Sequence, residues 1–349
     1  MSFSQEIIRW YQVHKRPLPW RTSTDPYKIW LSEIILQQTK VSQGTPYYMR
    51  FVSQFPTVFD LANASEEDVL KMWQGLGYYS RARNLHSAAK QVVNDFGGVF
   101  PKDYKGLLSL KGVGDYTASA IASICYHQPE AVLDGNVYRV LARYFGMDTP
   151  INTTQGFKLF KWRAQEHCDL DKPSDYNQGL MEFGALQCVP KSPDCPSCPL
   201  QRSCVAYQTN QVEKLPVKVP KKKPLKVFHH YVVYLDPNGH TIYTKREGKG
   251  IWEGLYEFPL LEASYPMEKK DVEEAISTMD LPKPDPLSLS LFNTEAVLHK
   301  LTHRHIYAYF WVARTTQSIE PATAFKHINT YPTSVLISDF IRAFKNSYF

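Results

Sequence analysis

The chain has 349 residues, more than one hydrophobic core usually supports, so its length predicts two domains. Its formal net charge of +6 and its 13% aromatic content fit a polyanionic partner without requiring one. No apolar run approaches the roughly 20 residues that cross a bilayer, and the first residues lack a basic stretch followed by an apolar one. We therefore exclude a membrane-spanning protein and expect a cytoplasmic one with reduced thiols.

Residues 1 to about 205 predict a bundle of helices. Asp25-Pro26 forms an N-cap and N1 pair, from which we expect a helix running to Gln38. Residues 65–68 carry the capping-box pattern ahead of an apolar stretch. Since the segments are amphipathic, we expect an all-α domain. The further expected helices cover residues 82–93, 104–110, 115–126, 136–145 and 174–187.

A segment of alternating proline and lysine, residues 214–224, ends the helical pattern. Such a sequence neither continues a helix nor packs, so we interpret it as an extended linker. Its lysines are expected to be solvated or to contact phosphate.

Beyond this linker the pattern predicts an α+β domain. Residues 231–235 alternate as a half-buried strand does, residues 236–239 form a turn and residues 241–244 return as a strand. We also expect a helix over 268–279, strands over 294–301 and 305–314, and a closing helix over 332–346. The expected divisions of the chain are a helical domain (1–187), a cysteine loop (188–211), a linker (212–226) and an α+β domain (227–349).

Four of the six cysteines are clustered, with the spacing Cys188-x6-Cys195-x2-Cys198-x5-Cys204. Four thiolates in one short loop are the ligands of an iron–sulfur cubane, and they also suit zinc. Zinc sites usually consist of two short Cys-x2–4-Cys pairs, so the longer gaps here favour a [4Fe–4S] cluster with a structural role. The other two, Cys125 and Cys168, are expected to be small buried residues.

The segment Leu110-Lys111-Gly112-Val113-Gly114 joins two predicted helices. A G-x-G pattern alone is weak and fits an ordinary turn, but with these flanking helices it resembles a helix-hairpin-helix. In that motif, hairpin N–H groups bind a DNA phosphate, which positions the protein without reading sequence. Asp134, farther along the chain, is either a helix cap or a catalytic carboxylate.

The hairpin, the downstream Asp134 and the cysteine loop, in this order and spacing, resemble the helix-hairpin-helix DNA glycosylases of the endonuclease III type. The resemblance spans roughly residues 5–205 and implies that Gly112 and Gly114 contact duplex DNA. Tyr116 stands where bifunctional members place a lysine that attacks the sugar and cleaves the strand. Because tyrosine cannot form an imine, the resemblance implies a monofunctional enzyme.

The segment from Leu31 to Thr39 surrounds Glu33 with apolar residues, where a glutamate is costly unless it is paired or functional. It resembles the signature of the MutY adenine DNA glycosylases, which excise adenine opposite 8-oxoguanine. Residues 20–21, 73–79 and 82–85 match the same family.

Residues 251–259 (IWEGLYEFP) resemble part of the MutT-like lesion-recognition domain of that family. The chain lacks the G-x5-E-x7-R-E-x2-E-E segment that holds magnesium in MutT-type hydrolases. The second domain is therefore expected to recognise the lesion and not to hydrolyse nucleotides. The resemblance implies an all-α glycosylase domain with a cluster loop, followed by an α+β MutT/Nudix-like domain.

Two carboxylates carry the implied chemistry. Glu33, with a pKa raised by its apolar surroundings, would protonate the flipped adenine, and Asp134 would stabilise the cationic sugar. Tyr116 and Asn136 would support these carboxylates. The resemblance also implies that the adenine pocket is lined by Arg16, Leu18, Trp20 and Arg21, with plain packing an equal interpretation for Trp20.

Contacts with the DNA and with the lesion are implied for further residues. Gln38 and Tyr78 would wedge into the stack beside the lesion. The turn Leu301-Thr302-His303 would meet 8-oxoguanine, although Leu301 replaces the aromatic residue of many relatives, and a basic surface strand end is the alternative interpretation. Arg83 and Arg143 are expected to be solvated or to face phosphate.

These features predict a monofunctional glycosylase of base excision repair. It would hydrolyse the glycosidic bond of adenine mispaired with 8-oxoguanine or guanine, acting as a nucleoid-associated monomer. A related glycosylase for thymine or uracil opposite guanine is one alternative, but it would not need the C-terminal domain. A non-catalytic iron–sulfur DNA-binding module is the other, but it would need neither Glu33 nor Asp134.

Overall fold

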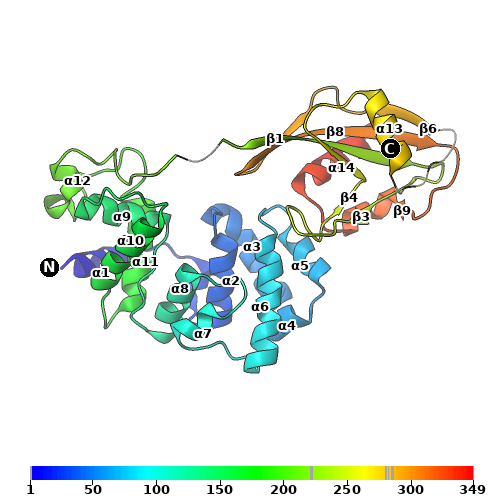
Figure 1. The fold of residues 1–349 in the computed structure, drawn as a ribbon. Coiled ribbons are helices and arrows are strands. Elements are labelled where there is room, and N and C mark those ends of the chain that lie inside the picture. Colours follow the sequence, from blue (N-terminus) through cyan, green and yellow to red (C-terminus); the bar gives the residue numbers. More distant parts are fainter. Residues whose placement is uncertain (1, 221–222, 280, 282, 284–286, 349) are drawn as a thin grey trace. The chain divides into compact units, whose positions relative to one another are not determined.

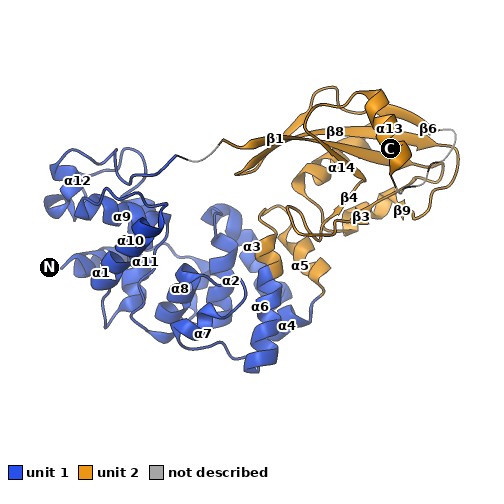
Figure 2. Ribbon diagram, viewed as in Figure 1, with its two compact units in different colours: residues 1–64, 84–220 blue, residues 65–83, 221–349 orange. Residues whose placement is uncertain are grey.

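The structure, a computed structural model, describes residues 2–220, 223–279, 281, 283 and 287–348. The chain divides into two compact units: unit 1 comprises residues 1–64 and 84–220, and unit 2 comprises residues 65–83 and 221–349 (Figure 2). Unit 2 thus takes in a short segment from the first half of the chain. Among the described residues, no helix combines the length and the apolar composition that a membrane crossing requires.

Unit 1 is helical (Figure 1). Its helices are α1 (Phe3–His14), η1 (Pro19–Thr22), α2 (Pro26–Leu36), α3 (Val41–Gln54), α4 (Val58–Asn63), most of α6 (Ser80–Phe96), α7 (Tyr104–Leu108), α8 (Asp115–Tyr126), α9 (Gly135–Phe145), α10 (Thr154–Glu166), α11 (Pro173–Leu186), η2 (Gln201–Ser203) and α12 (Val205–Gln208). The sequence patterns predicted α2, α6, α7, α8, α9 and α11 but did not predict α1, α3, α4 or α10.

Local chemistry explains where α2 begins and ends. The Asp25 side chain accepts a hydrogen bond from the Tyr27 N–H, and Pro26 supplies the fixed φ of a first helical residue. The helix ends at Leu36, so the prediction that it runs to Gln38 is wrong. Gln38 has a φ of 56°, which is incompatible with a right-handed helix.

The core of unit 1 forms around α8, whose residues from Thr117 to Ile124 are all buried. Alanine and serine dominate this stretch, so neighbouring helices can approach it closely. Helix α8 packs against α2, α7 and α11, and α11 also packs against α1 and α9. This arrangement brings the apolar faces of α2, α8, α9 and α11 into one core, where any charged side chain is desolvated.

The first part of the predicted linker packs against unit 1. Leu215 is buried, the Ile151 N–H donates to the Val217 carbonyl at 3.0 Å, and Asn152 forms two hydrogen bonds with the backbone of Val219. The expectation that this proline–lysine segment does not pack is therefore wrong for residues 215–219, because backbone groups there find partners that the composition cannot reveal. Lys221 and Lys222 lie outside the described residues.

Unit 2 contains a five-stranded mixed sheet with strand order β5-β1-β8-β6, and β7 also pairs with β8. Strands β1 and β8 run parallel, and the other pairs are antiparallel. The elements of unit 2 are α5 (Glu66–Trp73), the start of α6, β1 (Leu225–Leu235), β2 (His240–Thr241), β3 (Thr244–Lys245), β4 (Tyr256–Glu257), β5 (Leu260–Ala263), α13 (Lys269–Thr278), β6 (Leu287–Leu291), β7 (Val297–Lys300), β8 (Arg304–Thr315), β9 (Thr323–Ala324), η3 (Phe325–Thr330) and α14 (Val335–Tyr348).

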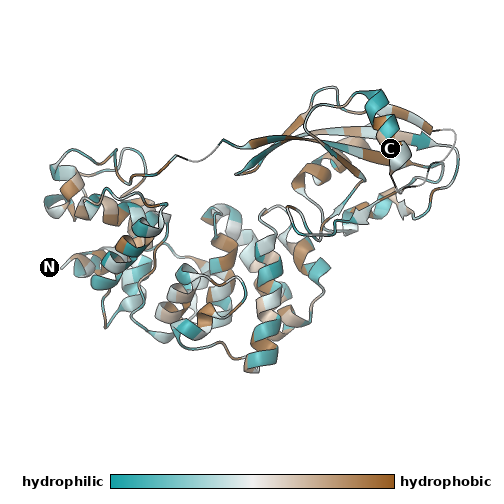
Figure 3. Cartoon of the chain, viewed as in Figure 1, coloured by the Kyte–Doolittle hydropathy of each residue, from teal (hydrophilic) through white to brown (hydrophobic). Residues whose placement is uncertain are grey.

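Strand β1 is buried on both faces over residues 229–234, whereas its alternating pattern had predicted a half-buried strand. Val232 belongs to a core cluster with Val272 and Ile276 of α13. On neighbouring β8, Phe310 stacks on Phe340 of α14 at 3.9 Å between ring centroids. Helices α13 and α14 therefore cover opposite faces of the sheet, and the hydrophobic colouring of β1, β8 and α14 agrees with this burial (Figure 3).

Several polar contacts anchor residues 65–83 within unit 2. The Lys71 ammonium donates to the Tyr331 carbonyl at 3.0 Å, and the Tyr79 hydroxyl donates to the Thr333 carbonyl at 3.1 Å. The Arg83 guanidinium pairs with the Glu253 carboxylate at 2.9 Å. These contacts thus fix residues 65–83, which include Tyr78 and Arg83, to the C-terminal part of the chain.

Candidate active site

A partly buried hydrogen bond links Glu33 of α2 to Tyr116 of α8. The tyrosine hydroxyl donates to Glu33 Oε2 at 2.6 Å and also lies 3.2 Å from Met181 Sδ on α11. The pKa of Glu33 is raised to about 7: burial is the main cause and the charge of Asp134 adds to it, while the Tyr116 hydrogen bond and the charge of Arg21 oppose the shift. A carboxyl group with this pKa can donate a proton near neutrality and accept one afterwards.

Asp134 is the N-cap of α9, and its side chain faces several donors. Oδ1 accepts the N–H groups of Asn136 (2.9 Å) and Val137 (2.7 Å), and Oδ2 accepts the Asn136 side-chain amide at 2.9 Å. Burial raises the pKa of Asp134, while these three hydrogen bonds and the charge of Arg139 oppose the shift. The structure therefore confirms the helix-cap interpretation of Asp134, and its role as a catalytic carboxylate stays a prediction.

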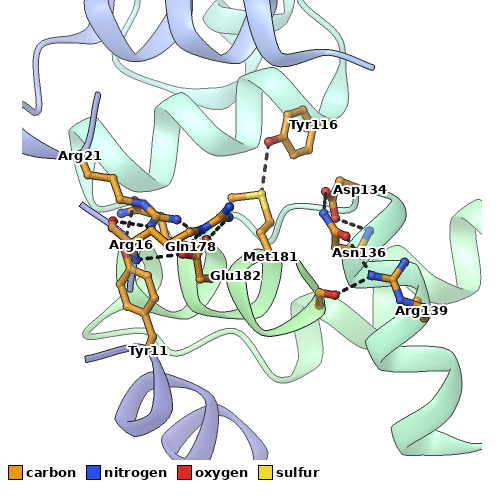
Figure 4. Close-up of polar contacts among 11 residues, drawn as sticks. Tyr11, Arg16, Arg21, Tyr116, Asp134, Asn136, Arg139, Gln178, Met181 and Glu182 are labelled. Carbon is orange, nitrogen blue, oxygen red and sulfur yellow. Dashed lines mark hydrogen bonds and ion pairs between the residues drawn. The ribbon is translucent and has the colours of Figure 1, made fainter. Parts of the chain in front are cut away.

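A chain of side chains continues from Asp134 toward the cysteine loop (Figure 4). Asn136 Oδ1 accepts a hydrogen bond from Arg139, which also donates to the carbonyls of Gly184 (2.7 Å) and Cys188 (2.8 Å). A Cβ on Gly184 would lie 2.7 Å from the Asn136 Cβ, so only glycine permits this approach of α11. The hydrogen bond from Arg139 and the close approach of α11 at Gly184 thus fix the orientation of Asn136.

Glu182 on α11 is a functional candidate that the sequence analysis missed. Both Arg16 and Arg21 donate to its carboxylate, with the closest pairs at 2.8 Å, and Arg21 also donates to the Arg16 carbonyl (Figure 4). Burial alone would raise the pKa of Glu182, but these hydrogen bonds lower it to about 2. Its only sequence signal was a glutamate among apolar residues, the signal that had singled out Glu33.

The four residues expected to line an adenine pocket, Arg16, Leu18, Trp20 and Arg21, all line one cavity of about 390 Å³ in unit 1. Trp20 is buried and packs edge-on against Tyr48, so it also serves the core. The described residues around this cavity do not include Glu33, Tyr116 or Asp134. The cavity residues still influence the carboxylates, since the charge of Arg21 lowers the pKa of Glu33.

The glycine hairpin lies between α7 and α8. Gly112 has a φ of 75°, and a Cβ there would meet the Asn84 side chain at 2.6 Å. A Cβ on Gly114 would meet nothing within 4 Å, and this N-cap offers no side-chain hydrogen bond to the first turn of α8. Glycine at 114 therefore leaves the first-turn amides open to an approaching ligand.

The four clustered cysteines line one small cavity together with Arg143. Burial raises the pKa of Cys198 to about 12, although a backbone N–H from Leu200 opposes the shift. Among the described residues, no group of three or more His, Cys, Asp or Glu side chains is arranged to hold a single metal ion. Four thiols around a common space are the donor set that an iron–sulfur cluster uses.

Two arginines lie in environments that differ from the prediction of solvated or phosphate-facing charges. Arg143 is buried and donates to the carbonyls of residues 189, 190, 212 and 215, with its Nη1 3.5 Å from Cys188 Sγ. Arg83 pairs with Glu253. Both predictions are wrong, because distant backbone carbonyls and one carboxylate satisfy these guanidinium groups.

A second cavity of about 680 Å³ lies wholly within unit 2. The turn between β7 and β8 contributes Leu301, Thr302 and His303, and residues 75–80 and Trp252 contribute other walls. The Tyr78 hydroxyl and Thr302 Oγ1 lie 3.0 Å apart. Trp252, which the sequence analysis had not singled out, packs on His299 at 5.5 Å and supplies an aromatic wall near Leu301.

Two residues predicted to enter the DNA share an unusual backbone. Gln38 (φ 56°) and Tyr78 (φ 49°) both lie in the left-handed region, as does Trp252 (φ 62°). Non-glycine residues adopt this conformation at a cost and are enriched at functional sites. Tyr78 is also half-exposed, at 51% of its surface, so its ring is available to a ligand.

Comparison with known proteins agrees with this arrangement. The family described as "HhH-GPD superfamily base excision DNA repair protein" matches residues 31–162, and the NUDIX domain family matches residues 230–342. The fold and the two family matches thus define a helix-hairpin-helix protein of base excision DNA repair with a NUDIX domain.

A more specific assignment comes from relatives of similar length. The adenine DNA glycosylase of Buchnera aphidicola subsp. Baizongia pistaciae (strain Bp) is 36% identical over 260 residues, which cover 74% of each chain. The chain belongs to the adenine DNA glycosylase family, and the predictions of this family, of its fold class and of a base-excision glycosylase are confirmed.

Two solved structures share the fold of part of this chain. A thermostable thymine-DNA glycosylase shares 31% identity with a TM-score of 0.56, covering 59% of this chain and 95% of that one. A trapped endonuclease III–DNA covalent intermediate shares the fold at 21% identity with a TM-score of 0.52, covering 59% of this chain and 94% of that one. The predicted endonuclease III-like fold is confirmed.

Proposed function

We propose that the protein hydrolyses the glycosidic bond of adenine opposite 8-oxoguanine or guanine in duplex DNA, without cleaving the strand. The observation that carries the proposal is buried Glu33, hydrogen-bonded to Tyr116 and close enough to Asp134 to feel its charge, with a pKa raised to about 7. Adenine is a poor leaving group until it is protonated, so a neutral carboxyl group beside a buried carboxylate suits this reaction.

The reaction begins once adenine leaves the duplex, which costs a few kcal/mol of stacking and pairing. Protonated Glu33 gives its proton to adenine N7 while the bond from the sugar to N9 breaks. The Tyr116 hydroxyl donates a hydrogen bond to Glu33 Oε2 and so stabilises the negative charge that remains on the carboxylate. Tyrosine at this position has no amine with which to open the sugar, which supports base removal alone.

Asp134 faces the cationic sugar that remains. Its hydrogen bonds with Asn136 and Val137 hold the carboxylate in one orientation, so its charge is in place before the cation forms. Glu33, now ionised, accepts a proton from the water that attacks the sugar carbon. The released adenine takes the hydrogen that Glu33 supplied, and the regenerated Glu33 carries the proton of the water.

The lesion is recognised in unit 2. The 680 Å³ cavity presents the Thr302 hydroxyl, the His303 imidazole and the rings of Tyr78 and Trp252, which suits hydrogen bonding and stacking with an oxidised purine. The missing Nudix metal segment supports binding without hydrolysis. Trp252 is the residue that compensates for an aliphatic Leu301.

Cys188, Cys195, Cys198 and Cys204 would hold a [4Fe–4S] cluster, which would supply a structural cross-link of the loop that follows α11. Arg143 ties that loop to residues 212 and 215 through its carbonyl contacts. The protein would act as a monomer on duplex DNA in the cytoplasm, close to the nucleoid.

A single-turnover assay tests the proposal on a duplex with adenine opposite 8-oxoguanine. We expect the adenine strand to break only after hot alkali, and Glu33→Gln to abolish breakage while leaving DNA binding intact. The expected loss is at least about 10²–10⁴-fold, the usual worth of a positioned acid.

Two results of this assay would contradict the proposal. Breakage without alkali would reveal a lyase and overturn the role given to Tyr116. Release of thymine or uracil opposite guanine, with adenine untouched, would favour the mismatch-glycosylase alternative instead.

A further inference from the structure

Lys161 on α10 is a partly buried cation that the proposed chemistry does not use. Its ammonium lies 2.9 Å from Asp115 Oδ1, and it donates to Ser119 Oγ at 2.9 Å and to the Ala131 carbonyl at 2.6 Å. Only 19% of its side chain is exposed. Since an ammonium has three protons, these three partners use its full donor capacity and fix its position.

The main partner of Lys161 stands beside the glycine hairpin. Asp115 is the first residue of α8 and directly follows Gly114, and its carboxylate also accepts the Tyr104 hydroxyl at 2.7 Å from α7, on the other side of the hairpin. Asp115 is thus held between both helices of the motif. Its carboxylate is 23% exposed and lies at the turn whose amides are left open by Gly114.

The charge of Asp115 has two opposing effects. A carboxylate in the first turn of a helix stabilises the helix through the macrodipole, which benefits α8 and therefore the placement of Tyr116. The same negative charge repels a phosphate that approaches the same amides. A phosphate can bind at these amides without a loss of affinity only if a fixed cation neutralises Asp115.

We propose that Lys161 is a positioning residue that neutralises Asp115 and so keeps the hairpin able to bind a DNA phosphate. This inference rests on the proposed function, because it assumes that the hairpin contacts DNA. It differs from a direct phosphate contact, since the three bonds of the ammonium all go to the protein. It also differs from plain packing, since it makes the effect of Lys161 depend on the charge of Asp115.

The same region offers reasons to expect that Lys161 can be replaced without unfolding the loop that leads to Asp134. The Ala131 N–H donates to Gln165 Oε1 at 2.9 Å, and the Val132 N–H donates to Asn177 Oδ1 at 3.0 Å. These two bonds remain when Lys161 is changed. A loss of DNA affinity would then report on charge at the hairpin.

The test is a double-mutant cycle of charge-neutralising substitutions in the full-length protein, with Lys161→Met, Asp115→Asn and the double variant. Anisotropy of a fluorescent undamaged duplex gives Kd across a series of salt concentrations, because phosphate contacts do not require a lesion. We expect Lys161→Met to weaken binding about ten-fold at low salt, since one unpaired charge then opposes a phosphate. We expect the double variant to bind within about two-fold of Asp115→Asn, and the loss to shrink as salt screens the charge.

Asp115→Asn by itself is a second test, which stands even if Lys161→Met fails to fold. It leaves Lys161 positive, so we expect binding at least as tight as that of the wild type. Thermal unfolding of each variant serves as the folding control.

The outcomes separate this inference from the proposed function. A double variant as weak as Lys161→Met, an unchanged Lys161→Met, or weaker binding by Asp115→Asn would overturn the neutralising role. A wild-type protein that binds no duplex at all would instead overturn the proposed function, whereas normal adenine release with no effect of Lys161→Met would overturn only the inference.

Discussion

The carboxylates of unit 1 and the turn at residues 301–303 of unit 2 are built in opposite ways. Glu33 and Asp134 are enclosed by helices, and burial shifts the pKa of each upward. Thr302 and His303 are exposed on a tight connection between β7 and β8. Proton transfer needs a desolvated group with a tuned pKa, whereas recognition of a base needs groups that a ligand can reach.

The two regions also differ in how many contacts hold each side chain. Three hydrogen bonds to Asp134 come from a single helix N-terminus, and Asn136 is held in turn by Arg139. Thr302 has the Tyr78 hydroxyl as its side-chain partner at 3.0 Å. We therefore expect substitutions in the buried centre to have larger effects than substitutions in the exposed turn.

After the loss of Glu33 itself, the largest effect is expected for the support of Asp134. Asn136→Ala removes a hydrogen bond to a buried carboxylate, worth about 1.5–3 kcal/mol, so single-turnover adenine release should slow by roughly 10–150-fold. Asn152→Ala, which breaks contacts with the backbone of Val219 only, is the matched control and should retain the wild-type rate. Equal rates for Asn136→Ala and the control would mean that Asp134 needs no such support.

The pH dependence gives the next largest effect. Because the pKa of Glu33 is raised to about 7, the acid is protonated below that pH, and the rate should fall about ten-fold per pH unit above it. The measurement is single-turnover adenine release from about pH 5.5 to about pH 9. A rate that stays flat through pH 9 would mean that Glu33 is not the acid.

Stability should respond to the same group with a defined sign. The pKa of Glu33 is higher in the folded protein than in the unfolded chain, so ionised Glu33 destabilises the fold. This destabilisation is absent below about pH 4.5 and complete above about pH 7. The shift corresponds to about 3 kcal/mol. Glu33→Gln should therefore be more resistant to urea than the wild type at pH 8, by an amount that disappears at low pH, which also separates lost activity from lost folding.

The smallest effect is expected in the exposed turn. Thr302→Val removes one neutral hydrogen-bonding group, worth about 0.5–1.5 kcal/mol, so the preference for 8-oxoguanine over guanine opposite adenine should fall by about two- to ten-fold. Thr302→Ser keeps the hydroxyl and should keep the preference. If Thr302→Val instead slowed release from both duplexes equally, the turn would support catalysis and the contrast between the two regions would fail.

Short-range signals in the sequence were sufficient for several elements and motifs. The Asp25–Pro26 start of α2 and the hairpin glycines depend on local backbone chemistry, which a few neighbouring residues reveal. The cysteine spacing likewise indicated a cluster loop without any knowledge of packing. Glu33 could be singled out because a charged residue in an apolar run is informative by itself.

Other features depend on residues far apart in the chain. Glu182 binds Arg16 and Arg21 across more than 160 positions, and Arg143 finds carbonyls in a segment that composition had marked as unpacked. The double-sided burial of β1 required α13 and α14 to cover opposite faces of the sheet. No local pattern specifies such partners, because their distances are set only when the helices and strands pack.

The sequence by itself determined the family, the order of the helical and α+β parts, and the residue types available for chemistry, since these follow from composition, spacing and local backbone preference. Only the tertiary structure decided that Tyr116 reaches Glu33, that residues 65–83 join unit 2, and that Lys161 meets Asp115. The physical reason is that burial and hydrogen bonding act through space, so the pKa of a carboxylate is a property of its neighbours in the fold and not of its neighbours in the chain.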